Sequence, residues 1–180
     1  MNKPDDNELV ARCQMGDRKA FEMLLVRYEK PVYNVAFRML RSREDARDVA
    51  QTVFLKAYEN LDRFDPAYRF FSWIYRIAMN ESIDCLAKVT RAETLDMEPE
   101  DDCDSTEERI DSQQAGRLVQ AALMGLKPDY RSVIVLKHFL DCSYTEISQI
   151  LDVPENKVKS RLYAGRQLLK DVLMKGEPHQ

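Results

Sequence analysis

The spacing of apolar residues is the feature that most constrains how this chain can fold. Between Ala46 and Leu61, apolar side chains recur at every third or fourth position through four turns. That spacing places them along one side of an α-helix. Similar stripes occur along most of the chain, and only 5 glycines among 180 residues argue against a turn-rich β fold. The sequence therefore predicts an all-α protein.

Four helices are expected in the first half of the chain, packed as one bundle. The first covers about Asn7 to Tyr28, with an interruption at Gly16 and Asp17, and the second begins at Pro31, because proline is tolerated in a first helical turn. The third is the stripe from Ala46 to Leu61, which the polar segment 62–66 ends. The fourth runs from about Tyr68 to Lys88.

An acidic stretch divides the chain into two modules. The whole chain has a net charge of -4, but ten of its 31 acids and one of its 27 bases lie between Ala92 and Asp111. The remainder therefore has 26 bases and 21 acids, a net charge of +5. Because the stretch is poor in apolar residues, we expect an extended or mobile linker. The predicted organisation is a helical bundle at 1–91, a linker at 92–111 and a second helical module at 112–180.

The most specific local signal is a helix-turn-helix between Ser143 and Leu173. Ser143 and Glu146 have the spacing of a capping box, and Asp152 stands where the turn needs a left-handed residue. The second helix, from about Glu155, buries Val158, Leu162, Leu169 and Val172 and carries an excess of lysine and arginine. Such a face can neutralise phosphates while its first turns reach base edges. An ordinary helical hairpin with a solvated basic face is the alternative.

The fourth predicted helix gathers an unusual set of residues on one side: Arg69, Trp73, Arg76, Asn80 and Asp84. Arginines hold phosphates, asparagine reads base edges and aromatic rings stack on unpaired bases. The same positions on a helical wheel also fit an alternative, in which Trp73 packs in the core and the arginines are solvated. Aromatic side chains pack in the protein core more often than they contact a ligand, and this applies to Phe64, Phe70 and Tyr75.

Other classes of function find little support in the residues. No paired catalytic groups, glycine-rich phosphate loop or metal-ligand cluster is evident, so we expect no enzyme, no catalytic or metal site and no cofactor. The cysteines are scattered without a CxxC pair, which favours reduced structural thiols: Cys13, Cys85, Cys103 and Cys142. No apolar run approaches the ~20 residues that span a bilayer, and no signal peptide is evident. We expect a cytoplasmic protein without membrane insertion.

Four blocks of the sequence, taken together, resemble the extracytoplasmic-function (ECF) sigma factors of bacterial RNA polymerase. These blocks are GDRKAFEMLLVRYEKPVYNVAFRML, DARDVAQTVFLKAYENLDRF, FFSWIYRIAMNESID and YTEISQILDVPENKVKSRLYAGRQLL, and they occur in family order. The resemblance implies a region 2 bundle and a region 4 helix-turn-helix. It also implies that the chain binds core RNA polymerase, directs it to promoters and helps open the −10 element.

The resemblance also implies partners and contact residues. Core polymerase would bind through the clamp of its largest subunit and the flap of its second subunit, and an anti-sigma protein is a further candidate partner. The clamp would contact Asp45, Asp48, Gln51 and Thr52. The −10 element would contact Phe64, in the loop from Leu61 to Tyr68, and Arg69, Trp73, Arg76, Asn80, Asp84 and Lys88. The −35 element would contact Lys157, Lys159, Ser160, Arg161, Tyr163 and Arg166.

Two departures from the family pattern affect single contacts. Ala164 stands where an arginine is common and Gly165 where alanine is common, which removes one candidate contact with the −35 element. Only Lys88 and Arg91 remain of a basic cluster that commonly follows ESID. Two other classes stay open on the residues alone: a DNA-binding repressor or activator that works without polymerase, and a helical adaptor or enzyme. Co-purification with core polymerase would separate the first from a sigma factor, and salt-dependent DNA binding would separate the second.

Overall fold

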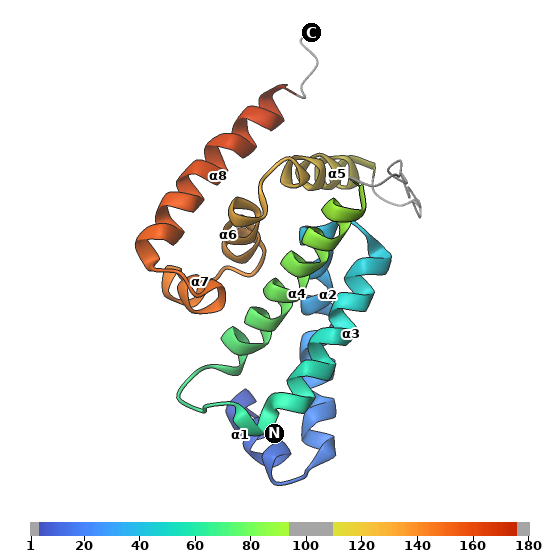
Figure 1. Cartoon of the computed structure of the whole chain (residues 1–180), viewed down its shortest axis with the longest axis vertical. Coiled ribbons are helices and arrows are strands. Elements are labelled where there is room, and N and C mark those ends of the chain that lie inside the picture. The colour runs from blue at the N-terminus through green and yellow to red at the C-terminus, as the bar shows by residue number, and fades with distance from the viewer. Residues whose placement is uncertain (1–3, 94–109, 176–180) are drawn as a thin grey trace.

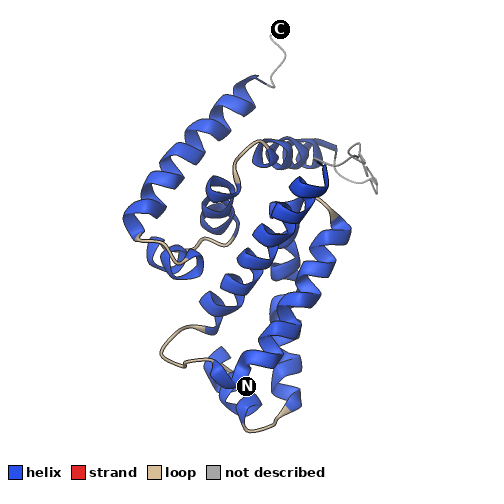
Figure 2. Ribbon diagram, in the orientation of Figure 1, coloured by secondary structure: helices blue, strands red, loops and turns tan. Residues whose placement is uncertain are grey.

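The computed structural model describes residues 4–93 and 110–175, and within them every regular element is helical. Figure 2 shows the helices joined by short loops. In chain order they are α1 (Asp6–Gln14), α2 (Arg18–Leu40), α3 (Arg43–Asn60), the 3₁₀ turn η1 (Leu61–Arg63), α4 (Phe70–Glu93), α5 (Ile110–Met124), α6 (Pro128–Phe139), α7 (Tyr144–Leu151) and α8 (Glu155–Lys175). The predicted all-α class is confirmed.

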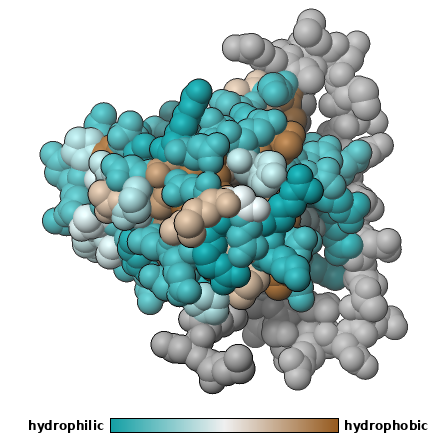
Figure 3. Space-filling view, turned by 90° about the horizontal axis from the view of Figure 1, so that it is seen from below, coloured by the Kyte–Doolittle hydropathy of each residue, from teal (hydrophilic) through white to brown (hydrophobic). Residues whose placement is uncertain are grey.

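The first four helices form a bundle in which α2, α3 and α4 run side by side and α1 packs across one end (Figure 1). The predicted stripe on α3 faces inward, with Ala46, Val53 and Ala57 fully buried. Seen from that end, the surface of the bundle is largely hydrophilic, with apolar colour in small areas only (Figure 3). The predicted interruption at Gly16 is confirmed, because its φ of 92° ends α1 and Asp17 then caps α2.

Pro31 does not begin a helix, and that prediction was wrong. It lies inside α2, which continues from Arg18 to Leu40. Proline in a helix interior costs about 3 kcal/mol because one backbone hydrogen bond is lost. Here the buried stripe of α2 passes through Pro31 in phase, with Tyr28 before it and Val32 and Val35 after it. Burial along that stripe holds the helix continuous.

The second module contains the predicted helix-turn-helix, formed by α7 and α8. Ser143 and Glu146 form the capping box, and Asp152 has the left-handed φ of 54° that ends α7. The Ser148 hydroxyl donates to the Val153 carbonyl at 2.7 Å, which closes the turn. Val158 and Leu162 are buried as expected, but Val172 is 41% exposed, so its predicted burial was wrong. The last turns of α8 extend beyond the body of the module (Figure 1).

The two modules pack against each other instead of standing apart. Helices α5 and α6 contact α2, and α7 contacts α4. The buried residues of both modules form one continuous cluster. The sequence predicts the modules separately and gives no sign of this contact. The predicted linker conformation falls largely on residues 94–109, outside the described part of the chain.

No helix in the described part of the chain is both long enough and apolar enough to cross a membrane.

Candidate nucleic-acid interface

The start of α8 presents the first candidate surface, which we call the α8 surface: Lys157, Lys159, Ser160 and Tyr163. All four residues are exposed, and the Tyr163 ring is 70% exposed. Lys159 Nζ lies 5.6 Å from the ring of Tyr144, so this ammonium group sits beside the first residue of α7. The positive groups and the exposed phenol suit contact with phosphates and base edges.

Two other predicted contacts on α8 are engaged within the second module. Arg161 donates to Asp129 of α6 at 2.7 Å, and its side chain is only 22% exposed. Arg166 donates to His138 Nε2 at 3.3 Å. These pairs tie α8 to α6, so Arg161 is positioned to orient α8 against α6.

Gly165 explains one departure from the family pattern. A Cβ atom at this position would lie 3.2 Å from Ile134 Cγ1 and 3.4 Å from Tyr130 Cβ. Both contacts are with α6, so the glycine permits α6 and α8 to approach closely.

The second candidate surface, the α4 surface, comprises Arg69, Arg76, Asn80 and Asp84. All four residues are exposed; Arg76, Asn80 and Asp84 lie on one side of α4, as the helical wheel predicts, and Arg69 directly precedes its first turn. Lys88 is exposed one turn further along. The surface combines two guanidinium groups with an amide and a carboxylate, a set that can hold phosphates and read base edges.

Trp73 and Phe64 lie differently from the other predicted −10 residues. Phe64 is 4% exposed, and its ring packs edge-on against Phe70 and Trp73 at centroid distances of 6.0 and 5.4 Å. Trp73 is half-buried in the same group. Phe64 and Phe70 therefore belong to the core and shape the base of the loop that precedes α4.

Tyr68 is the aromatic residue of that loop which sequence reasoning missed. Its side chain is 56% exposed, at the end of the loop that leads into α4. The sequence did carry a signal for it: Tyr68 is an aromatic residue that follows Pro66 and precedes the apolar stripe of the next helix.

The third candidate surface lies on α3 and comprises Asp48, Gln51, Thr52 and Leu55. Asp48 and Gln51 are exposed and Thr52 is half-buried. Leu55, which the sequence analysis missed, continues the same face and is 58% exposed. Asp45 is half-buried, and its charge adds to the effect of burial in raising the pKa of the Cys85 thiol on α4. An exposed leucine beside polar groups suits a protein partner better than solvent.

The α4 surface is partly covered by α7. Arg69 and Glu146 form an ion pair at 2.5 Å. Arg76 donates through Nε and a terminal nitrogen to the Gln149 carbonyl, at 3.1 and 2.7 Å, and the same nitrogen lies 3.4 Å from Asp152. The structure thus brings two predicted −10 residues against the helix-turn-helix.

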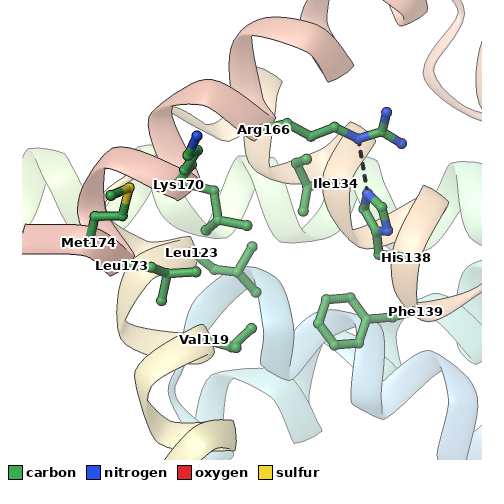
Figure 4. A pocket seen from close by; sticks show the side chains of 10 residues that line it. Val119, Leu123, Ile134, His138, Phe139, Arg166, Lys170, Leu173 and Met174 are labelled. Atoms are coloured by element: carbon green, nitrogen blue, oxygen red, sulfur yellow. Dashed lines mark hydrogen bonds between the residues drawn. The ribbon is translucent and has the colours of Figure 1, made fainter. Parts of the chain in front are cut away.

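A groove of about 430 Å³ lies between α5, α6 and α8 (Figure 4). Its floor is apolar, with Leu123 and Ile134 at its base and Phe139 at one end. Arg166 and Lys170 lie along its α8 rim. A groove of this kind suits an apolar segment that also carries negative charge.

The described thiols lie in environments that oppose reactivity. Burial raises the pKa of Cys13 and Cys85, and burial with the nearby Glu146 raises the pKa of Cys142 to about 12. Thiolate fractions at neutral pH are then small. Cys103 lies outside the described residues. Within the described part of the chain, no three His, Cys, Asp or Glu side chains gather as a metal site would require.

Comparison with known proteins covers both modules. Residues 24–92 match the family described as Sigma-70 region 2, and residues 116–169 match that described as Sigma-70, region 4. The ECF RNA polymerase sigma factor SigW of Bacillus subtilis (strain 168) is 34% identical over 176 residues, covering 91% of this chain and 94% of the relative. The ECF RNA polymerase sigma-E factor of Escherichia coli (strain K12) is 33% identical over 176 residues, covering 91% and 92%.

Solved structures agree in fold. CnrH in complex with the cytosolic domain of CnrY has a TM-score of 0.75 at 26% identity, over 96% of this chain and 99% of CnrH. The sigma factor RpoE in complex with the anti-sigma factor NepR from Bartonella quintana has a TM-score of 0.72 at 22% identity, over 88% and 99%. With both regions matched and relatives aligned over nearly their whole length, the chain belongs to the ECF sigma factors of the sigma-70 family.

Proposed function

We propose that this chain binds core RNA polymerase, directs it to a defined set of promoters and helps to open the −10 element. The observation that carries the proposal is the pairing of two family regions, each with its own basic, exposed surface, in one chain. Members of this family are initiation factors and not enzymes. The polymerase catalyses RNA synthesis, and this chain determines the promoter at which synthesis starts.

The α8 surface is proposed to contact the −35 element. Lys157 and Lys159 would neutralise phosphates, and Ser160 and Tyr163 would face the base edges from the start of the helix. Arg161 is held by Asp129, so its contribution includes the angle at which α8 enters the groove.

The α4 surface is proposed to contact the −10 element. Arg69 and Arg76 would hold the backbone, and Asn80 would read a base edge. Tyr68 provides the exposed ring on which an unpaired base can stack, an interaction worth about 1–3 kcal/mol per base. Because a captured base cannot pair again, stacking at this loop would join sequence reading to strand opening.

The polymerase is proposed to bind at two places. The face of Asp48, Gln51, Thr52 and Leu55 on α3 would receive the clamp of the largest subunit. The groove beneath Arg166 and Lys170 would receive an apolar segment of the flap of the second subunit. An anti-sigma protein, as in the solved complex of RpoE with NepR, would compete for one or both places.

Run-off transcription tests the proposal directly. Core RNA polymerase from the source organism is assayed on a genomic promoter library, with and without the full chain. New start sites that require the protein, sharing two sequence elements, are the expected result. DNA binding without new initiation would overturn the proposal in favour of a repressor or activator.

One variant and its matched control test the docking assignment by co-purification with core polymerase. Asp48→Arg is expected to abolish co-purification with core polymerase and leave the helical content unchanged. Glu29→Arg, at an exposed acid on α2 away from the proposed docking face, is the matched control and is expected to behave as the unmodified chain. Normal holoenzyme formation by Asp48→Arg would remove the docking assignment from α3.

A further inference from the structure

The loop that leads into α4 buries few of its own side chains. This loop, residues 61–68, leaves the end of α3 and reaches α4 beside α1 (Figure 1). Its buried side chains are Leu61 and Phe64, each 4% exposed. Every residue from Asp65 to Tyr68 is exposed. Burial therefore fixes the base of the loop, and hydrogen bonds have to fix its tip.

Asp65 builds the turn at the tip of the loop. Its backbone carbonyl accepts from the Tyr68 amide at 3.0 Å, and its Oδ1 accepts from the Ala67 amide at 2.9 Å. Aspartate is favoured at the first position of such a turn because its side chain holds the amide two residues on. Proline is favoured at the second position because its φ is already set, and Pro66 stands there. Both side chains thus favour the turn that ends at Tyr68.

A further hydrogen bond ties the base of the loop to α1. The Leu61 carbonyl accepts from the Phe64 amide at 3.1 Å and from Gln14 Nε2 at 3.0 Å. Gln14 is the last residue of α1. The helix end around it is closed by Arg12, which donates to Asp17 Oδ2 through two nitrogens at 3.0 and 2.8 Å. A fixed helix end therefore holds the Leu61 carbonyl across 47 positions of sequence.

These bonds determine how Tyr68 is presented. Its backbone closes the turn, and its side chain is 56% exposed just before α4 begins. A ring that is already in place loses less conformational entropy on binding than a ring on an unordered loop. The bonds of Asp65 and Gln14 therefore favour stacking of a base on Tyr68.

The charge of Asp65 opposes the effect of its hydrogen bonds. An exposed carboxylate beside a DNA-binding surface repels phosphates, so charge alone predicts that its removal tightens DNA binding. Loss of the turn predicts the reverse, because Tyr68 would no longer be held. The sign of the change on removing Asp65 therefore separates the two effects.

From these contacts we propose that Asp65 and Gln14 are positioning residues for the capture of an unpaired −10 base. They hold residues 61–68 in the conformation that presents the Tyr68 ring. The inference rests on the proposed role of Tyr68 in opening the −10 element. Asp65 acts within the loop through the turn, and Gln14 acts from α1 through the Leu61 carbonyl. The loop is then set before DNA arrives.

Asp65→Ala is the principal test, made in holoenzyme formed with core polymerase from the source organism. Two labelled probes come from a promoter found in the run-off assay: one with its −10 element unpaired, and a duplex that ends upstream of that element. Asp65→Ala is expected to bind the unpaired probe about fivefold more weakly, as for loss of one hydrogen bond, and the duplex equally well. Asp65→Asn keeps the accepting oxygen and is expected to restore binding to the unpaired probe.

Asp62→Ala is the matched control, because it removes an exposed carboxylate from the same loop and leaves the turn at Asp65 intact. It is expected to bind the unpaired probe as tightly as the unmodified chain or more tightly. In a Tyr68→Ala background, Asp65→Ala is expected to have no further effect, since Asp65 acts through that ring.

Gln14→Leu tests the second positioning residue, because it removes the donor to the Leu61 carbonyl and keeps a side chain of similar size. Binding to the unpaired probe is expected to weaken about threefold, again with no change on the duplex. Circular dichroism checks that both variants stay helical.

Two results would overturn the positioning role. One is unchanged binding of the unpaired probe by Asp65→Ala and Gln14→Leu, and the other is an equal loss on both probes, which indicates a general loss of structure. Failure of the proposed function has a different signature: unmodified holoenzyme would bind the unpaired probe no better than core polymerase alone, and the positioning role would fall with it.

Discussion

The α8 surface and the α4 surface carry similar chemistry but differ in what covers them. Lys157, Lys159 and Tyr163 face solvent, whereas Arg69 and Arg76 are bonded to α7. The surface whose arginines are bonded to α7 is the one proposed to open DNA. Exposure of a basic face in one part of a chain therefore does not imply that a second basic face is equally available.

The largest effect is expected at Arg131. Loss of its side chain would weaken the contact between the two modules, and with it the difference between the α4 surface and the α8 surface. Arg131→Met leaves the carbonyls of Leu123, Leu126 and Met39 without their donor. Each buried carbonyl left unpaired costs about 1–3 kcal/mol, so we expect the free energy of unfolding to fall by about 3 kcal/mol. Urea unfolding followed by circular dichroism measures it. Arg117→Met, at an exposed site on α5, is the control, and a loss equal to that control would contradict the assignment.

Arg76→Ala tests, within the holoenzyme, whether the α4 surface contacts DNA as well as α7. If Arg76 contacts the −10 element as proposed, we expect this variant to reduce run-off transcription about tenfold, since a charge-assisted contact is worth ~1.5–3 kcal/mol. Varying the upstream promoter sequence is expected not to change the defect. If the variant forms open complexes at the full rate, Arg76 contributes to the contact between the modules and does not contact the −10 element.

Lys159→Ala addresses the uncovered surface and should act already in the free chain. Loss of one phosphate contact is expected to weaken duplex binding at all sequences and to lower the slope of log affinity against log salt by about one. A titration at several salt concentrations gives the slope. An unchanged slope would place this ammonium off the DNA, beside the Tyr144 ring.

The smallest effect is expected from protonation of His138, where α6 contacts α8. Burial, Arg166 and Lys137 lower the pKa of His138 below 6.5, so the folded state favours neutral imidazole, which accepts from Arg166. The unfolded chain binds the proton more readily, so stability falls as pH drops from 6.5 through the lowered pKa. Melting temperatures across that window test it against His138→Gln, which is expected to show a flatter profile.

Local signals in the sequence predicted local structure well. The capping box at Ser143, the left-handed Asp152 and the stripe of α3 are each set by residues within a few positions of one another. For the same reason the helix-turn-helix and the exposed lysines of α8 could be placed without a structure. Family resemblance added the order of the two regions.

Features that depend on distant residues could not be predicted this way. Arg76 meets Gln149 across 73 positions, and Arg161 meets Asp129 across 32. Pro31 looked like a helix start because local rules place proline there, but packing along the whole of α2 overrides them. Val172 has helical spacing, yet α8 extends past the helices that would cover it. Phe64 was expected both in the core and on DNA, and only its neighbours Phe70 and Trp73 reveal its burial.

The bond from Arg131 to the Met39 carbonyl also orders events during synthesis. Its two partners are separated by 92 positions. At ~5–20 residues per second, a ribosome adds the second partner on the order of ten seconds after the first. During that interval the bundle of α1 to α4 can fold with Arg69 and Arg76 free of α7. In a nascent chain the α4 surface is therefore uncovered first, and α7 packs against it only after the second module has been made.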